Sequence, residues 1–247
     1  MRVFCRYDQQ LDYFLKSIVQ SVLVSYGNQL SLDGLGEIEL IEDLPGFSDG
    51  RTIQGGKKIV LASRLFHGLP TYEISKLSNN ENYRHIISTI FHEMGHASDM
   101  KAMPNIYAKA QDLEHKEQML PAYFWVEYLA EKRSCSANIA SHIEYCEDFV
   151  ARKWRSYRFD FCTYTEENFF YLCKALAYFM GRTIDSNMRQ EYCAKMKNPL
   201  LKSFISSIAE ELLVLESYLP FDDVGKLFDL ENIMNTYYLR FCETFTP

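Results

Sequence analysis

Two histidines four positions apart, with a glutamate between them, are the residues of this chain best suited to catalysis. His92, Glu93 and His96 form the pattern H-E-x-x-H. Positions i and i+4 of a helix lie on one face, so the two imidazoles can converge on one zinc ion at about 2.0–2.1 Å. Glu93 would lie beside them and act as general base toward a zinc-activated water, whose pKa falls to about 7. The spacing therefore predicts hydrolysis of an amide bond without a covalent intermediate.

A catalytic zinc site also needs a third protein ligand and an open position. The metzincin pattern would have Gly at position 99 and His at position 102, but this chain has Asp99 and Ala102, which excludes that class. Glu127 and Glu131 are spaced so that both face the same way on a helix. One carboxylate can bind zinc, and the other can accept the free N–H of a ligating histidine. The competing interpretation is a solvated acidic pair supported by the neighbouring Lys132 and Arg133.

Two further groups compete for the third position. Asp99 lies on the same helix face as His92 and His96, but one straight helix seldom wraps three ligands around a tetrahedral ion. Support of a ligand, or simple capping, is therefore expected of Asp99. His115 lies in a polar stretch and is expected to be solvated. The remaining histidines have no ligand-like spacing and are assigned structural roles: His67, His85 and His142.

The motif H-E-M-G-H, followed downstream by E-Y-L-A-E, resembles the gluzincin pattern H-E-x-x-H … E-x-x-A-[DE/N]. It is similar to the ImmA/IrrE-type zincins and to the HtpX-like membrane peptidases. The ImmA/IrrE type is nearer, because no run of about 18 apolar residues occurs here. The resemblance covers about Ile59 to Arg133. It implies that His92, His96 and Glu127 are ligands, that Glu93 is the base, and that Glu131 takes the supporting position usually held by Asp or Asn.

Before the motif, the hydrophobic spacing predicts one helix and two strands. Residues 9–26 have apolar side chains at helical spacing, and residues 37–42 alternate strictly between acidic and apolar. A second strand is expected over residues 57–62, after Gly55 and Gly56. We expect the two strands to form a small antiparallel sheet. The strand at 57–62 is either an ordinary edge strand or the edge that pairs with an extended substrate.

From Asn82 onward the pattern is helical. The first helix carries the motif and ends at Pro104, and Pro121 is expected at the start of the next, which runs through Glu127 and Glu131 toward Tyr145. Gly181 is interpreted as a C-cap. Further helices are predicted over residues 166–180, 188–196, 200–218 and 223–241.

Charge develops on the carbonyl oxygen during the predicted attack, so a donor should stabilise it. The helical half offers Tyr164, Tyr178 and Arg182 as candidates for this oxyanion role. The chain has many tyrosines, and the sequence does not choose among the three.

Composition narrows the classes of partner. The formal net charge of −7 argues against a nucleic-acid partner, which would require clustered Lys and Arg. No membrane span or targeting segment is evident. The seven cysteines lack a C-x-x-C pair and are interpreted as reduced thiols of a cytoplasmic protein.

Together these features predict an α+β, zincin-like fold that is mainly helical, with a small antiparallel sheet near the N-terminus. Residues 1–247 would form one metallopeptidase domain, with the sheet and motif helix in 1–110 and the third ligand in the helical part, 111–247. The expected function is a Zn²⁺-dependent endopeptidase acting on a protein or peptide, and the resemblance implies a regulatory protease with one protein substrate. The alternatives are a non-catalytic zincin-fold binding protein and a structural zinc site.

Overall fold

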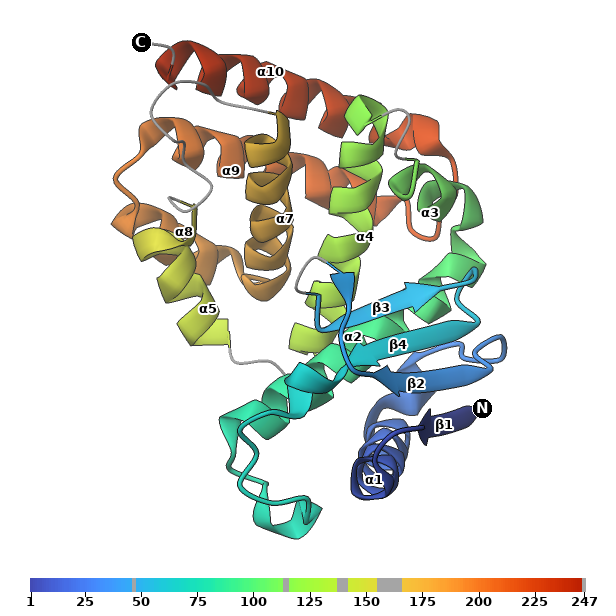
Figure 1. Cartoon of the computed structure of the whole chain (residues 1–247). Helices are drawn as coiled ribbons and strands as arrows, with labels where there is room; N and C mark the ends of the chain where they lie inside the picture. The colour runs from blue at the N-terminus through green and yellow to red at the C-terminus, as the bar shows by residue number, and fades with distance from the viewer. Residues whose placement is uncertain (46–47, 113–115, 137–141, 155–165, 246–247) are drawn as a thin grey trace. The chain divides into compact units, whose positions relative to one another are not determined.

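The computed structural model (Figure 1) describes the chain apart from residues 46–47, 113–115, 137–141, 155–165 and 246–247. The chain forms two compact units. The first contains Met1–Pro104 and the last turn of helix α4, from Arg133. The second contains Asn105–Lys132 and the described residues from His142 onward.

The first unit is built on a four-stranded sheet in the order β1-β2-β4-β3. The strands are β1 (Arg2–Cys5), β2 (Glu37–Ile41), β3 (Gly50–Ile53) and β4 (Lys58–Ala62). Strands β1, β2 and β4 are parallel, and β3 is antiparallel to β4. The sheet is therefore mixed.

The predicted antiparallel pairing of the strands at residues 37–42 and 57–62 is wrong, because β2 and β4 are parallel. Strand β3, which was not predicted, forms a hairpin with β4 through Gln54, Gly55 and Gly56, all with positive φ. That hairpin fills the antiparallel position beside β4, so β2 lies parallel on its other side. Strand β4 is consequently internal, and its predicted role as an edge strand is wrong because the edges are β1 and β3.

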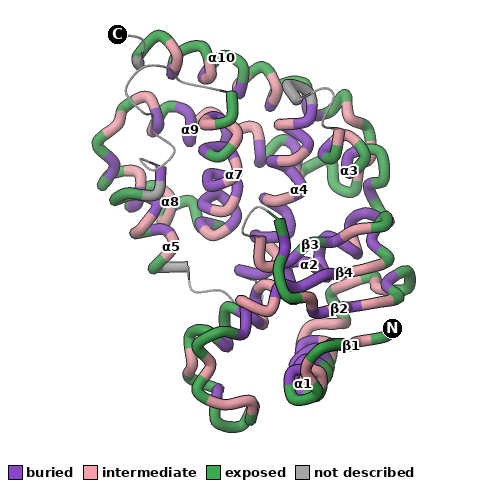
Figure 2. Tube along the Cα trace, in the orientation of Figure 1, coloured by how far each residue is buried: buried purple, intermediate pink, exposed green. Residues whose placement is uncertain are grey.

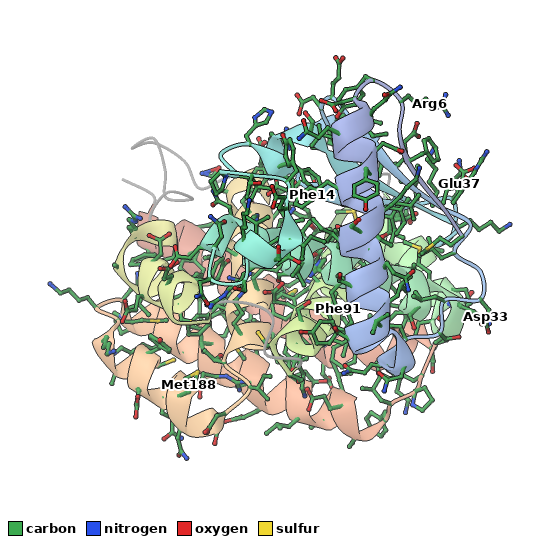
Figure 3. The ribbon with its side chains drawn as sticks, turned by 90° about the horizontal axis from the view of Figure 1, so that it is seen from below. Arg6, Phe14, Asp33, Glu37, Phe91 and Met188 are labelled. Carbon is green, nitrogen blue, oxygen red and sulfur yellow. The ribbon has the colours of Figure 1, made fainter. Side chains whose placement is uncertain are left out.

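Two helices contact this sheet and form the core of the unit with it. Helix α1 (Gln9–Tyr26) and helix α2 (Glu81–Ala102) were both predicted. Ile38 and Leu40 of β2 pack in one cluster with side chains of both helices and are at most 1% exposed. Figure 3 labels Phe14 of α1 and Phe91 of α2, and Figure 2 shows the buried stretches of α2. Short 3₁₀ turns complete the unit: η1 (Gly27–Gln29), η3 (Ser63–Phe66) and η4 (Ile74–Lys76).

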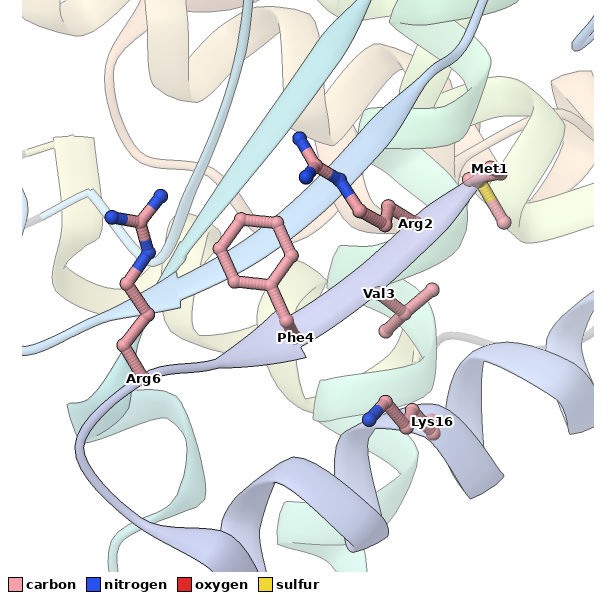
Figure 4. A pocket seen from close by; sticks show the side chains of 6 residues that line it. All are labelled: Met1, Arg2, Val3, Phe4, Arg6 and Lys16. Atoms are coloured by element: carbon pink, nitrogen blue, oxygen red, sulfur yellow. The ribbon is translucent and has the colours of Figure 1, made fainter.

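Beside β1 lies a hollow lined by Met1, Arg2, Val3, Phe4, Arg6 and Lys16 (Figure 4). Its two arginines pair with the acidic residues of β2, Arg2 with Glu37 and Arg6 with Glu39. Lys58 of β4 also pairs with Glu39, at 2.6 Å. The acidic side chains predicted on one face of β2 thus form ion pairs with basic side chains on both sides of the strand. Such cross-strand pairs of opposite charge stabilise neighbouring strands.

The second unit is helical in all its described elements. These are α3 (Pro104–Ala110), α4 (Lys116–Ser136), α5 (His142–Asp148), the π-helix η5 (Phe149–Lys153), α7 (Glu166–Arg182), α8 (Ser186–Lys195), α9 (Pro199–Ser217), the 3₁₀ turn η6 (Val224–Leu227) and α10 (Phe228–Phe245). Aromatic rings join them: Phe169 of α7 stacks on Phe204 of α9 with centroids 5.7 Å apart.

Two predicted helix ends differ from the structure, namely the start at Pro121 and the C-cap at Gly181. Pro121 lies inside α4 rather than at its start, because the helix already begins at Lys116. Helix α4 is described as far as Ser136 and Tyr145 lies in α5, while residues 137–141 between them lie outside the described residues. Gly181 lies within α7 rather than capping it: a Cβ there would come 2.8 Å from the Cβ of Glu131 and 2.9 Å from the backbone nitrogen of Lys132. The glycine permits close packing of α7 against α4.

Candidate metal centre

Helix α2 holds the motif in place through the core beneath it. Asn80 caps its N-terminus by accepting a hydrogen bond from the backbone N–H of Tyr83. Ile90, Phe91 and Met94 are fully buried. These apolar neighbours anchor the turn that carries His92, Glu93 and His96, so the polar side chains have little freedom to rotate away.

The two imidazoles converge as predicted from their spacing. Their Nε2 atoms lie 3.0 Å apart and their ring planes meet at 84°. Two nitrogen ligands of a tetrahedral zinc ion, each at about 2.0–2.1 Å, would be roughly 3.3–3.4 Å apart. The separation is therefore close to that of a chelating pair.

The three side chains of the motif are all buried. His92 is 8% exposed, and Glu93 and His96 are each 7% exposed. Burying several ionisable groups in one helical turn is unfavourable unless they are hydrogen-bonded or coordinate a metal. Buried ionisable groups cluster more often at functional sites than in ordinary cores.

The structure brings Glu127 of α4 to the histidine pair. His92, His96 and Glu127 each offer one ligand atom, and these atoms all lie within 4.8 Å of one another. The Glu127 oxygen Oε2 has no contact with solvent. Two imidazoles and one carboxylate form the donor set of many catalytic zinc sites. This group could hold a metal ion, and it contains the three residues predicted as ligands.

Glu131, one helical turn beyond Glu127, is held by an ion pair. Its Oε1 accepts a hydrogen bond from Nε of Arg182, and its side chain is only 4% exposed. The guanidinium of Arg182 also lies over the ring of Tyr145, 4.2 Å from its centroid. Glu131 and Arg182 thus bind each other, while support of a histidine by Glu131 and the oxyanion role of Arg182 stay predictions.

Asp99 also has a cationic partner. Its Oδ1 accepts a hydrogen bond from Nη2 of Arg133 at 2.7 Å. This bond joins α2 to the last turn of α4 within the first unit. The sequence predicted a supporting or capping role for Asp99, and the ion pair with Arg133 is the contact that the structure shows.

The oxyanion candidates differ in what the structure reveals. Burial, followed by the nearby charges of Glu127 and Glu131, raises the pKa of Tyr178 well above its usual value. Tyr178 therefore remains a protonated phenol that can donate a hydrogen bond. Tyr164 and His115 lie outside the described residues.

Glu93 has neighbours that the sequence did not reveal. Thr52 of β3 donates a hydrogen bond to its carboxylate, and Gly50 of the same strand leaves space for its side chain. Strand alternation places positions 50 and 52 on one face. That signal becomes visible only once residues 50–53 are recognised as a strand.

Comparisons with known proteins found no match. No protein-family model, no curated protein and no solved structure matches the chain.

In the part of the chain that the structure describes, none of the helices combines the length and apolar character that a membrane crossing requires. Six described cysteines are free thiols, among them Cys146, whose pKa burial raises to about 12.

Proposed function

We propose that this protein is a zinc-dependent endopeptidase of the cytoplasm with a zincin-like fold. The observation that supports this most strongly is the buried convergence of His92, His96 and Glu127, with Glu93 on the same turn of α2. A metal ion of the zinc class would supply a Lewis acid and an activated water there. His92, His96 and Glu127 would hold the ion.

Residues of the chain would supply the general base and the donor that stabilises the oxyanion. Glu93 takes a proton from the attacking water and returns it to the leaving amine. Tyr178, kept protonated by burial and by nearby carboxylates, is the better of the two described donors for the developing oxyanion, since Arg182 is engaged by Glu131. A regulatory role with one protein substrate is the most specific form of this proposal.

Substitution of Glu93 by Gln tests the proposal. The carboxylate is the base, but it is not among the proposed ligands, so E93Q should retain about one zinc per chain while kcat falls roughly 100- to 10,000-fold. Zinc content is measured by elemental analysis of the purified full chain, and hydrolysis by a quenched fluorescent peptide library. His92→Ala should lose both zinc and activity.

Glu81→Gln is the matched control, because it makes the same chemical change in the exposed first turn of α2. It should match the wild type in both measurements. Zinc-loaded wild type that cleaves no member of the library would contradict the peptidase proposal. Biological activity retained by E93Q would instead favour the non-catalytic binding protein.

A further inference from the structure

The side chain of Glu93 is clamped by the edge strand β3. The hydroxyl Oγ1 of Thr52 lies 2.7 Å from the carboxylate oxygen Oε2 of Glu93 and 2.9 Å from the backbone carbonyl oxygen of the same residue. Thr52 is itself 8% exposed. One buried hydroxyl thus contacts both the carboxylate and the backbone of Glu93. These two contacts fix the carboxylate relative to the helix backbone.

Gly50 supplies the space that this conformation needs. A Cβ at position 50 would come 2.8 Å from Cγ of Glu93 and 3.1 Å from its Cδ. A Cβ contact below 3.0 Å is essentially never observed, and Cγ is in the middle of the side chain rather than at its tip. Any larger residue at position 50 would therefore displace the Glu93 carboxylate.

Strand β3 is anchored firmly enough to act as a support. Gly50 pairs with Leu61 of β4, and Thr52 pairs with Ile59, both of which are fully buried. Asp49, just before the strand, accepts hydrogen bonds from the backbone N–H of Ala62 at 2.9 Å through its carbonyl and from Nε of Arg64 at 3.2 Å through its carboxylate. The clamp is thus attached to an internal strand of the sheet.

We propose that Thr52 is a positioning residue for Glu93, and that Gly50 is the gap that admits the Glu93 side chain. This inference rests on the proposed function, in which Glu93 is the general base. Proton transfer requires the base within hydrogen-bonding reach of the attacking water, and a displacement of about 1 Å can reduce the rate roughly 100-fold. A threonine suits this role because its branched Cβ restricts χ1, which directs the hydroxyl.

The hydroxyl and the methyl group of Thr52 can be tested separately. Thr52→Val removes the hydroxyl at nearly constant shape, whereas Thr52→Ser keeps the hydroxyl and removes the methyl. With the zinc-loaded full chain, T52V should lower kcat roughly 10- to 100-fold and leave KM within about twofold. T52S should keep kcat within about threefold of the wild type. Zinc content should be the same in all three proteins.

A second pair of variants keeps the test decisive if T52V unfolds. Gly50→Ala retains Thr52 but forces the Glu93 side chain to move, so it should lower kcat and leave zinc content unchanged. Gly34→Ala is its control, because a Cβ at Gly34 meets nothing within 4 Å. It should match the wild type.

Crystal structures of the zinc-loaded variants provide a readout that does not depend on activity. Glu93 should occupy one conformer in the wild type and in T52S, and a displaced or divided conformer in T52V and G50A. The inference would be overturned if Glu93 keeps its position and kcat stays at the wild-type value in either T52V or G50A. It would also be overturned if kcat falls as far in T52S as in T52V. If the wild type cleaves no peptide, the proposed function fails, and the conformers of Glu93 still decide whether Thr52 positions it.

Discussion

Each of the two units buries a glutamate, and each holds it in a different way. Glu93 in the first unit is 7% exposed and is bound by the neutral hydroxyl of Thr52. Glu131 in the second unit is 3% exposed and is bound by the guanidinium of Arg182. Both side chains come from long helices.

The difference lies in what each partner does to the charge. A guanidinium compensates a buried carboxylate and forms directional hydrogen bonds with it, so the pair is satisfied within itself. A hydroxyl orients a carboxylate without cancelling its charge. The contact with Arg182 therefore fits a structural role for Glu131, and the contact with Thr52 fits the proposed role of Glu93 as a base. We therefore expect loss of Glu131 to reduce stability and loss of Glu93 to reduce activity.

The largest effect is expected for the variant Glu131→Gln. The variant leaves the partly buried guanidinium of Arg182 facing a neutral amide, and breaking the ion pair of the buried Glu131 in this way should lower the free energy of unfolding by about 3–5 kcal/mol. Chemical denaturation followed by circular dichroism measures the loss. E131Q/R182M, which removes both charges, should recover part of it. E93Q should stay within about 1 kcal/mol of the wild type. Equal losses in E131Q and E93Q would remove the distinction.

A smaller effect is expected at the contact that brings Glu131 toward α7. Gly181→Ala would place a Cβ 2.9 Å from the backbone nitrogen of Lys132 and 3.0 Å from the carbonyl oxygen of Tyr128. Backbone atoms cannot rotate aside, so overpacking should cost about 1–3 kcal/mol in the free energy of unfolding.

Gly27→Ala, at the end of α1, is the control for that variant. Its nearest neighbour would be the flexible side chain of Leu23 at 3.7 Å, an ordinary contact. Thermal unfolding should show a lower Tm for G181A and little change for G27A. A G181A protein as stable as the wild type would show that α4 and α7 can separate at no cost.

The smallest effect is expected at Asp49, a partly exposed carboxylate. A hydrogen bond with His85, assisted by one from Arg64, holds its pKa below the usual value. A lowered folded-state pKa stabilises the fold above the unfolded pKa of about 3.9, and this contribution disappears as pH falls through the folded value. Asp49→Asn should therefore cost about 0.2–1 kcal/mol at pH 6 and nothing near pH 2. Unfolding curves at both values measure the difference, and a cost that persists at pH 2 would contradict this cause.

Much of the candidate site could be predicted because its signals are local. The spacing of His92 and His96 dictates their convergence once the segment is helical, and the apolar stripe of α2 predicted that helix. Glu127 was predicted from its position in a second helix and from the resemblance to gluzincins, and the structure groups it with both histidines.

The errors concern long-range pairing. Strand β3 is short, begins with glycine and has little alternation, so nothing local distinguishes it from a loop. Missing β3 led to the wrong pairing of β2 with β4 and to the wrong edge strand. Pro121 was assigned to a helix start by its residue type, but α4 extends from Lys116 and contains Pro121.

The grouping of two imidazoles and a carboxylate on one apolar-anchored helical turn follows from the sequence, because helix geometry makes residues close in sequence neighbours in space. The contacts that restrain those groups depend instead on long-range packing. Thr52 and Gly50 reach Glu93 through the pairing of β3 with β4 and the packing of β3 against α2. Arg133 reaches Asp99 through the last turn of α4. Such contacts join residues distant in the chain, and their register is fixed by burial of the whole sheet rather than by any local pattern.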